Sequence, residues 1–296
     1  MNHKIKKLIY PLYNLLNNRV VRGVKRKMYL NGGRKPWSRG YNEHKHFEIN
    51  SAISNAQVLE AFRNGKAPEN FGVGVDERIF EYTWIFSRLD DDDKKMLDAG
   101  STFNYKYLLE HSAIVNREVT IFTFYPEVPS FKNKKGKQYV YGDLRKMELR
   151  SEAYDLVVSQ STIEHIDMDN NIYGYDISKN DDVNLKSYDY LLAVKEMLRV
   201  MKPNGKLLLT FPFGIFKNYG FFQQFDNEMV DKLTDLLDDA GSYTVEYGLY
   251  KSEGWNFAKQ AECSKSLSFN PHTGQDQGTD GAAHCRSVCL IEFIKE

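Results

Sequence analysis

The stretch Lys95-Met-Leu-Asp98-Ala-Gly100-Ser-Thr-Phe-Asn104 decides the fold. A short apolar run ends in an acid, a small residue and a glycine, and a helix-compatible segment, residues 105–111, follows at once. A strand that turns through a glycine into a helix is the first unit of many nucleotide-binding α/β sheets. The glycine lets the backbone approach a ligand, and the helix N-terminus offers N–H groups to an anion. Because many parallel-sheet proteins turn in this way, the interpretation depends on the sequence downstream.

Downstream of this stretch, short apolar runs alternate with helical patterns. Such alternation predicts an α/β fold with a mostly parallel sheet and helices on both faces. Two prolines and a polar tail in residues 125–137 predict a loop or a single turn there. Lys202-Pro-Asn-Gly205 is expected to end a helix. We expect strands at 95–99, 118–124, 138–141, 154–159, 206–211, 243–250 and 287–294, and helices at 105–111, 185–201 and 227–240.

The composition excludes several classes of protein. The 40 Lys and Arg balance the 40 Asp and Glu, which argues against a general nucleic-acid binder. The three cysteines, Cys263, Cys285 and Cys289, argue against a disulfide framework and for a reducing, cytoplasmic setting. Together with His284 they lack a second ligand pair at a recognised spacing, so we predict no metal site. No apolar run reaches the ~18 residues that span a bilayer, and no signal peptide is expected.

The N-terminal part is basic and helical in pattern. Residues 1–42 contain no Asp or Glu, and residues 4–28 carry apolar side chains at helical spacing among Lys and Arg, with a kink expected at Pro11. Three uses stay open. Residues 1–30 form a helix on an anionic membrane surface, or a helix packed on the main domain, or they bind an acidic substrate or glycan phosphate. Further helices are expected at 51–64 and 77–89. We therefore divide the chain into a helical extension, 1–75, and a main domain, 76–296.

Four motifs in residues 95–213 agree in order and spacing with one family. They are Leu97-Asp98-Ala-Gly100; Gly142-Asp143-Leu144; the run from Tyr154 to the pair Glu164-His165; and the run from Leu198 through Lys202-Pro-Asn-Gly205 to Pro212. Residues 95–213 thus resemble a class I S-adenosylmethionine (SAM)-dependent methyltransferase. The resemblance implies a Rossmann-like, doubly wound sheet of seven strands, mostly parallel, with the last strand antiparallel. It also implies SAM as the cofactor.

The resemblance assigns roles to individual residues. Gly100 would leave space for the cofactor, Asp143 would accept a hydrogen bond from the adenine amino group, and Ser159 and Gln160 would lie at the switch point of the sheet. Glu127 is the nearest acid to the position after the second strand where an acid usually binds the ribose. The cofactor-binding residues are expected to be Asp98, Gly100, Ser101, Asn104, Glu127, Asp143, Leu144, Ser159 and Gln160.

The catalytic candidates are His165 and Glu164. Imidazole titrates near neutral pH, which makes His165 the first candidate for a general base, although a structural histidine that caps the turn is an equal alternative. The insertion between His165 and residue 185 would either shape the acceptor pocket or form an acidic loop.

The first hypothesis is therefore a SAM-dependent methyltransferase that acts on a small molecule or sugar, in surface-polysaccharide biosynthesis, without a nucleic-acid partner. The second is a non-catalytic binding or scaffold protein on the same fold, because only one glycine stands in the turn after the first strand. A nicotinamide-dependent enzyme is disfavoured because the G-x-G-x-x-G turn is missing.

Overall fold

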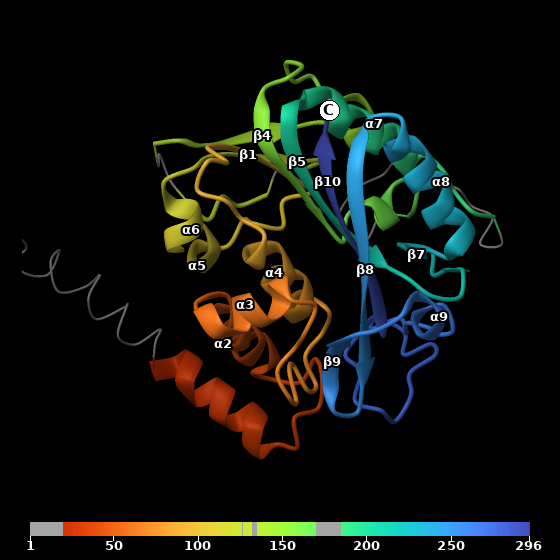
Figure 1. The fold of residues 1–296 in the computed structure, drawn as a ribbon. Coiled ribbons are helices and arrows are strands. Elements are labelled where there is room, and N and C mark those ends of the chain that lie inside the picture. The colour runs from red at the N-terminus through yellow and green to blue at the C-terminus, as the bar shows by residue number, and fades with distance from the viewer. Residues whose placement is uncertain (1–19, 126, 132–134, 170–184) are drawn as a thin grey trace, which may run out of the picture.

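The computed structural model describes residues 20–125, 127–131, 135–169 and 185–296. Its centre is an eight-stranded sheet with the order β3-β2-β1-β4-β5-β10-β8-β9 (Figure 1). The first five strands in this order are parallel, and the last three are antiparallel to their neighbours. The strands are β1 Lys95–Ala99, β2 Glu118–Thr123, β3 Lys137–Tyr141, β4 Tyr154–Gln160, β5 Met201–Pro212, β8 Gly241–Lys251, β9 Gly254–Phe257 and β10 Ser287–Lys295.

The sheet confirms the predicted α/β class, the mostly parallel order and the antiparallel last strand. The predicted number of strands is wrong, because β9 adds an eighth strand at the edge beside β8. Its four residues are too few to show a periodic pattern, yet Trp255 is buried and stacks on Phe80. A separate two-stranded sheet, β6 Lys217–Asn218 and β7 Gln223–Gln224, lies after β5.

Successive side chains of the central strands enter two different cores. Met96 and Leu156 pack in one hydrophobic cluster, while their chain neighbours Leu97 and Val157 pack in the other. This is the period-two alternation of a sheet that is covered on both faces. The first face is covered by α2 Tyr41–Ile53, α3 Ala56–Arg63, α4 Arg78–Ser87, α5 Lys106–Leu109 and α6 Ser112–Val115, and the second by α7 Tyr190–Val200, α8 Asn227–Asp238 and α9 Gln260–Cys263.

The helices before β1 differ in part from the expectation. A single helix over 51–64 is wrong, because the chain breaks between α2 and α3. There Asn55 caps α3 by accepting hydrogen bonds from the backbone N–H groups of Gln57 and Val58. Residues 20–31 form a further helix, whereas residues 1–19 lie outside the described residues. The extension as a whole, and its boundary at residue 76, therefore stay predictions.

Two predicted breaks can be compared with the structure. The described residues between β2 and β3 contain no helix, as expected. Helix α7 ends at Val200, and the next residues form an irregularity of β5, since Met201 pairs with Tyr154 while Lys206 pairs with Leu156. Most of the insertion between His165 and residue 185, namely residues 170–184, falls outside the described residues. Within the described ranges, every helix is too short or too polar to cross a lipid bilayer.

Candidate functional site

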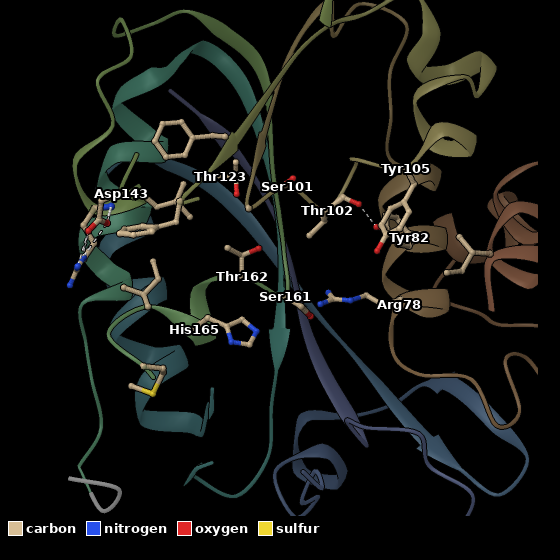
Figure 2. A pocket seen from close by; sticks show the side chains of 18 of the residues that line it. Arg78, Tyr82, Ser101, Thr102, Tyr105, Thr123, Asp143, Ser161, Thr162 and His165 are labelled. Atoms are coloured by element: carbon tan, nitrogen blue, oxygen red, sulfur yellow. Dashed lines mark hydrogen bonds and ion pairs between the residues drawn. The ribbon is translucent and has the colours of Figure 1, made fainter. Parts of the chain in front are cut away.

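A cleft of about 390 Å³ opens at the carboxyl ends of the parallel strands. That volume lies within the usual range for small-ligand pockets. The cleft lies where β1 and β4 adjoin, which is the switch point of a doubly wound sheet. One side is formed by the turns after the strands, and the other by α2 and α4 (Figure 2). Its lining includes Lys45, His46, Arg78, Tyr82, Gly100, Ser101, Thr102, Tyr105, Tyr107, Thr123, Asp143, Leu144, Ser161, Thr162 and His165.

The turn after β1 is shaped by Asp98. This carboxylate is fully buried and accepts hydrogen bonds from the backbone N–H groups of Thr102 at 3.0 Å and Phe103 at 2.8 Å. Burial raises the pKa of Asp98 to about 7. Asp98 thus lies beneath the turn and holds it, and the neighbouring Gly100 and Ser101 line the cleft.

Position 100 requires a glycine because Thr162 lies close to it. The φ of Gly100 is +133°, and a Cβ atom here would lie 2.8 Å from Thr162 Cβ and closer still to Thr162 Oγ1. The space that the sequence assigned to a cofactor on that side of Gly100 is therefore filled by Thr162. Phe103 packs in the core against Phe86 and leaves the turn open. Gly100 and Asp143 line one cleft, as the resemblance implies.

Two further residues of the expected cofactor set link the turn to the chain after β2. Ser101 donates a hydrogen bond to the exposed Glu127 carboxylate. Asn104 donates through Nδ2 to the Val128 carbonyl at 3.1 Å and accepts from the Ser130 backbone N–H at 2.7 Å. Of these, Ser101 lies in the cleft lining, whereas Glu127 and Asn104 support it from outside.

Asp143 and Leu144 lie at the rim of the cleft, after β3. The Asp143 carboxylate accepts hydrogen bonds from the Arg145 backbone N–H at 2.8 Å and from Arg145 Nη2 at 2.7 Å. Although burial alone would raise it, these bonds hold the pKa of Asp143 below its usual value. Arg145 Nη1 also donates to Asp189 at 2.7 Å. An ionised carboxylate is thus fixed where the resemblance places the adenine. Any ligand that bonds to this carboxylate would share it with Arg145.

Ser159 and Gln160 are fully buried at the end of β4. They lie beneath the cleft, and the next two residues, Ser161 and Thr162, form its lining. The sequence therefore placed the ligand side of this strand one or two residues too early. If the strand had been predicted to continue to Gln160, where β4 ends, Ser161 and Thr162 would have been the expected ligand-facing residues.

The buried carboxylate of Glu81 ties α4 to two strands. Oε1 accepts hydrogen bonds from Ser161 Oγ at 2.6 Å and Thr210 Oγ1 at 2.7 Å. Oε2 accepts from Arg78 Nη1 at 3.0 Å and Gln160 Nε2 at 3.2 Å. Figure 2 shows the Arg78 guanidinium beside Ser161 in the cleft. A glutamate within an otherwise apolar helix indicates a buried carboxylate that needs polar partners. The sequence does not show which partners these are, because they are distant along the chain.

His165 and Glu164 are adjacent in the structure. His165 Nδ1 lies 2.6 Å from the Phe221 carbonyl oxygen. A carbonyl only accepts, so Nδ1 carries the proton, and Nε2 of the neutral ring carries the lone pair. Burial lowers the pKa of His165 to about 4, so the ring is neutral at pH 7. Its Nε2 lies 3.9 Å from Glu164 Oε1, and burial raises the pKa of that carboxyl well above its usual value.

The part of the opposite wall that α2 forms was not expected. Lys45 and His46 reach it from α2, and Lys45 Nζ lies 2.6 Å from Asp76 Oδ2. The His46 ring contacts Tyr105 and Tyr107, with centroid distances of 5.2 and 5.3 Å. No local sequence pattern indicates this wall, because α2 reaches the cleft only through tertiary packing.

One group of possible metal ligands lies outside the cleft lining. The Nδ1 atom of His284 is 3.0 Å from Glu77 Oε1 and 3.1 Å from Cys285 Sγ. The three ligand atoms lie within 4.8 Å of one another. The sequence grouped His284 and Cys285 with Cys289, but Cys289 packs in the second hydrophobic cluster and Glu77 takes its place. The hydrogen bond between His284 Nδ1 and Glu77 holds these two side chains together without an ion.

The chain is similar to known methyltransferases. Residues 97–209 match the family model described as a methyltransferase domain. A putative SAM-dependent methyltransferase from Listeria monocytogenes has a TM-score of 0.43 and 11% identity, covering 73% of this chain and 97% of that one. The 1,6-didemethyltoxoflavin-N1-methyltransferase of Burkholderia thailandensis has a TM-score of 0.40 and 12% identity, covering 94% and 88%.

The YcgJ protein of Bacillus subtilis has a TM-score of 0.42 and 12% identity, covering 69% of this chain and 92% of that one. No curated protein matches the sequence. The segment that matches the family model begins within β1 and ends within β5, the last of the five parallel strands. In its residues 97–209, the chain is similar to the methyltransferase-domain family.

Proposed function

We propose that the protein binds SAM in the cleft and transfers its methyl group to a small molecule or sugar. The observation that carries the proposal is that Gly100, Asp143 and His165, which come from three separate turns, line one cleft. Bound SAM would supply an electrophilic methyl group on a sulfonium centre. The protein must then hold the acceptor in line with that group and accept its proton.

The residues of the cleft fit such a cofactor. The ionised Asp143 at one end is an acceptor for an amino group. Arg78, held by Glu81, is a cation suited to a carboxylate, and it lies on the far side of the cleft from Asp143 (Figure 2). The ribose position is the least usual part, because Thr123 stands at the end of β2 and the nearest acid, Glu127, reaches the cleft through Ser101.

His165 is the residue we assign to the acceptor's proton. Its Nδ1–H is committed to Phe221, so Nε2 is the atom that accepts. Glu164 Oε1 lies 3.9 Å from Nε2, on the side of the ring that would accept the proton, and burial raises the pKa of this carboxyl. The neutral imidazole carries a lone pair on Nε2 for the acceptor's proton.

The wall formed by Tyr82, Tyr105, Tyr107 and His46 supports a ring-shaped acceptor, because aromatic faces pack well on flat or ring surfaces. A sugar of a surface glycan fits this description. We also propose a reducing, cytoplasmic setting, which the three free, buried cysteines support.

The alternative function is a non-catalytic binding protein on the same fold. It is favoured by one observation: Asp143, the expected adenine partner, is already engaged by Arg145. Such a protein would hold another ligand in the cleft and transfer no methyl group.

Titration calorimetry with SAM and with its demethylated product distinguishes the two functions. We expect binding in the micromolar range, weakened at least tenfold by Asp143→Ala. The matched control is Asp189→Ala, which removes the other carboxylate partner of Arg145 and should leave affinity unchanged. No heat at millimolar ligand would favour the alternative, and equal loss in both variants would move the adenine site elsewhere.

A further inference from the structure

The helix formed by residues 20–31 presents an apolar stripe to solvent. Val20, Val21, Val24 and Met28 are 63%, 42%, 52% and 46% exposed. On a helix with 3.6 residues per turn, these four positions fall within about 100° of arc. Isolated exposed apolar side chains are ordinary on a protein surface, but four aligned on one helix face form a patch.

The opposite side of the same helix is fixed to the body of the protein. Tyr29 is buried, and its hydroxyl donates to the Arg34 carbonyl at 3.0 Å. Lys25 pairs with Glu43 at 3.0 Å and Arg26 with Glu48 at 3.2 Å, both on α2. Figure 1 shows this helix at the edge of the molecule, on the outer side of α2. The body therefore holds the helix so that its apolar stripe faces outward.

The surroundings of the stripe are positively charged. Residues 1–42 contain no Asp or Glu, although the chain as a whole is neutral. Five basic side chains of the described part of this segment are exposed: Arg22, Lys27, Arg34, Lys35 and Arg39. On the helix itself, Lys27 borders the stripe, whereas Arg22 lies about 100° from its edge. An apolar stripe within a basic segment is the pattern of a helix that lies in the interface of an anionic membrane.

We infer that the helix of residues 20–31 docks this protein on an anionic lipid surface, with the valine stripe among the acyl chains and the basic residues at the phosphate groups. A nucleic acid would use the charges but not the stripe, and a second protein copy would use the stripe but would oppose like charges. The inference does not depend on methyl transfer.

The docking helix is linked to the cleft through α2. The same helix α2 that holds it through Glu43 and Glu48 carries Lys45 and His46 into the cleft. Docking would therefore place the lipid surface beside the helix of residues 20–31, which contacts the cleft-lining helix α2.

The test is co-sedimentation of the full chain with vesicles. We expect binding to vesicles of mixed phosphatidylcholine and phosphatidylglycerol at low salt, and at least tenfold weaker binding to phosphatidylcholine alone or at high salt. Recovery in the supernatant with both vesicle types would overturn the inference.

Two variants locate the contact. Val21→Asp with Val24→Asp should weaken vesicle binding at least tenfold, since it places charge in the stripe. Arg22→Glu with Lys27→Glu should do the same and reduce the salt dependence. The control is Val128→Asp with Leu192→Asp, which changes apolar side chains that are 88% and 46% exposed elsewhere. Circular dichroism checks that each variant folds.

Three outcomes would contradict the docking. These are equal loss in the control, tighter binding to RNA than to vesicles through the same basic residues, and a dimer of the wild-type chain that the valine substitutions dissociate.

Discussion

The Glu81 carboxylate lies 3.0 Å from the Arg78 guanidinium and holds it in the cleft. The two residues are three positions apart on α4, and the same carboxylate accepts hydrogen bonds from Ser161 and Thr210 at the ends of β4 and β5. One buried side chain therefore connects helix α4, the floor of the cleft and the Arg78 cation that lines the cleft.

Replacing Glu81 by Gln should lower both stability and ligand affinity. The change keeps the shape but removes the charge that compensates Arg78, and breaking a buried pair of this kind costs about 3 kcal/mol. Urea unfolding measures the stability, and calorimetry with SAM the affinity. Glu60→Gln is the control, because it removes an exposed partner of Arg63 at the same spacing and should cost about 0.5 kcal/mol or less. Equal effects of the two substitutions would contradict this role of Glu81.

Gly100→Ala should destabilise the protein by about 3 kcal/mol, through strain at positive φ and overlap with Thr162. Gly33→Ala separates the two causes, since Gly33 also has a positive φ but has no atom near its Cβ position. We expect it to cost about 1 kcal/mol. Adding Thr162→Gly to Gly100→Ala should give less destabilisation than the sum of the single changes in a double-mutant cycle; simple additivity would show that Thr162 is not the obstacle.

The pKa of Asp98 predicts a pH dependence of stability. Burial raises it from 3.8 to about 7, so between these values the folded state binds a proton that the unfolded state has lost. Stability from this group is therefore greatest below about pH 4 and falls as pH rises to about 7. The slope is at most about 1.4 kcal/mol per pH unit. The difference in unfolding free energy between wild type and Asp98→Asn should follow this course and level off above neutral pH. A flat difference across this range would mean that Asp98 is ionised in both states.

His165→Asn should lower kcat/KM about 100-fold or more while SAM affinity changes less than about twofold, if His165 accepts the acceptor's proton. His272→Asn is the control, because this second imidazole contacts the same Phe221 ring, at 5.2 Å, outside the cleft lining. Retention of activity within about threefold in His165→Asn would assign His165 to the structural cap of the turn.

Local patterns allowed much of the sheet to be predicted. Strand β1 was found with its bounds because the apolar run and the glycine turn are adjacent in sequence. The edge strand β9 was missed because its stability comes from Trp255 and Phe257, which pack against Phe80 on α4. A four-residue run gives no period, and only the tertiary contact distinguishes it from a loop.

The cleft was predicted only where its residues follow the ends of strands. Gly100, Asp143 and His165 are of this kind, since each follows the end of a strand within a few residues. Arg78 was not assigned to it, because its place in the cleft depends on contacts of α4 with residues that are distant in sequence. No spacing within α4 indicates which of its faces meets β4 and β5.

The separation between Glu81 and Thr210 has a consequence for synthesis of the chain. During synthesis, α4 would leave the ribosome well before β5. Glu81 would lack its hydrogen bond from Thr210 until 129 further residues had been translated. A fragment expressed from residue 97 to residue 209, the limits of the family match, would lack both Glu81 and Thr210. A minimal fragment with a complete cleft therefore has to begin before α4 and continue past Thr210.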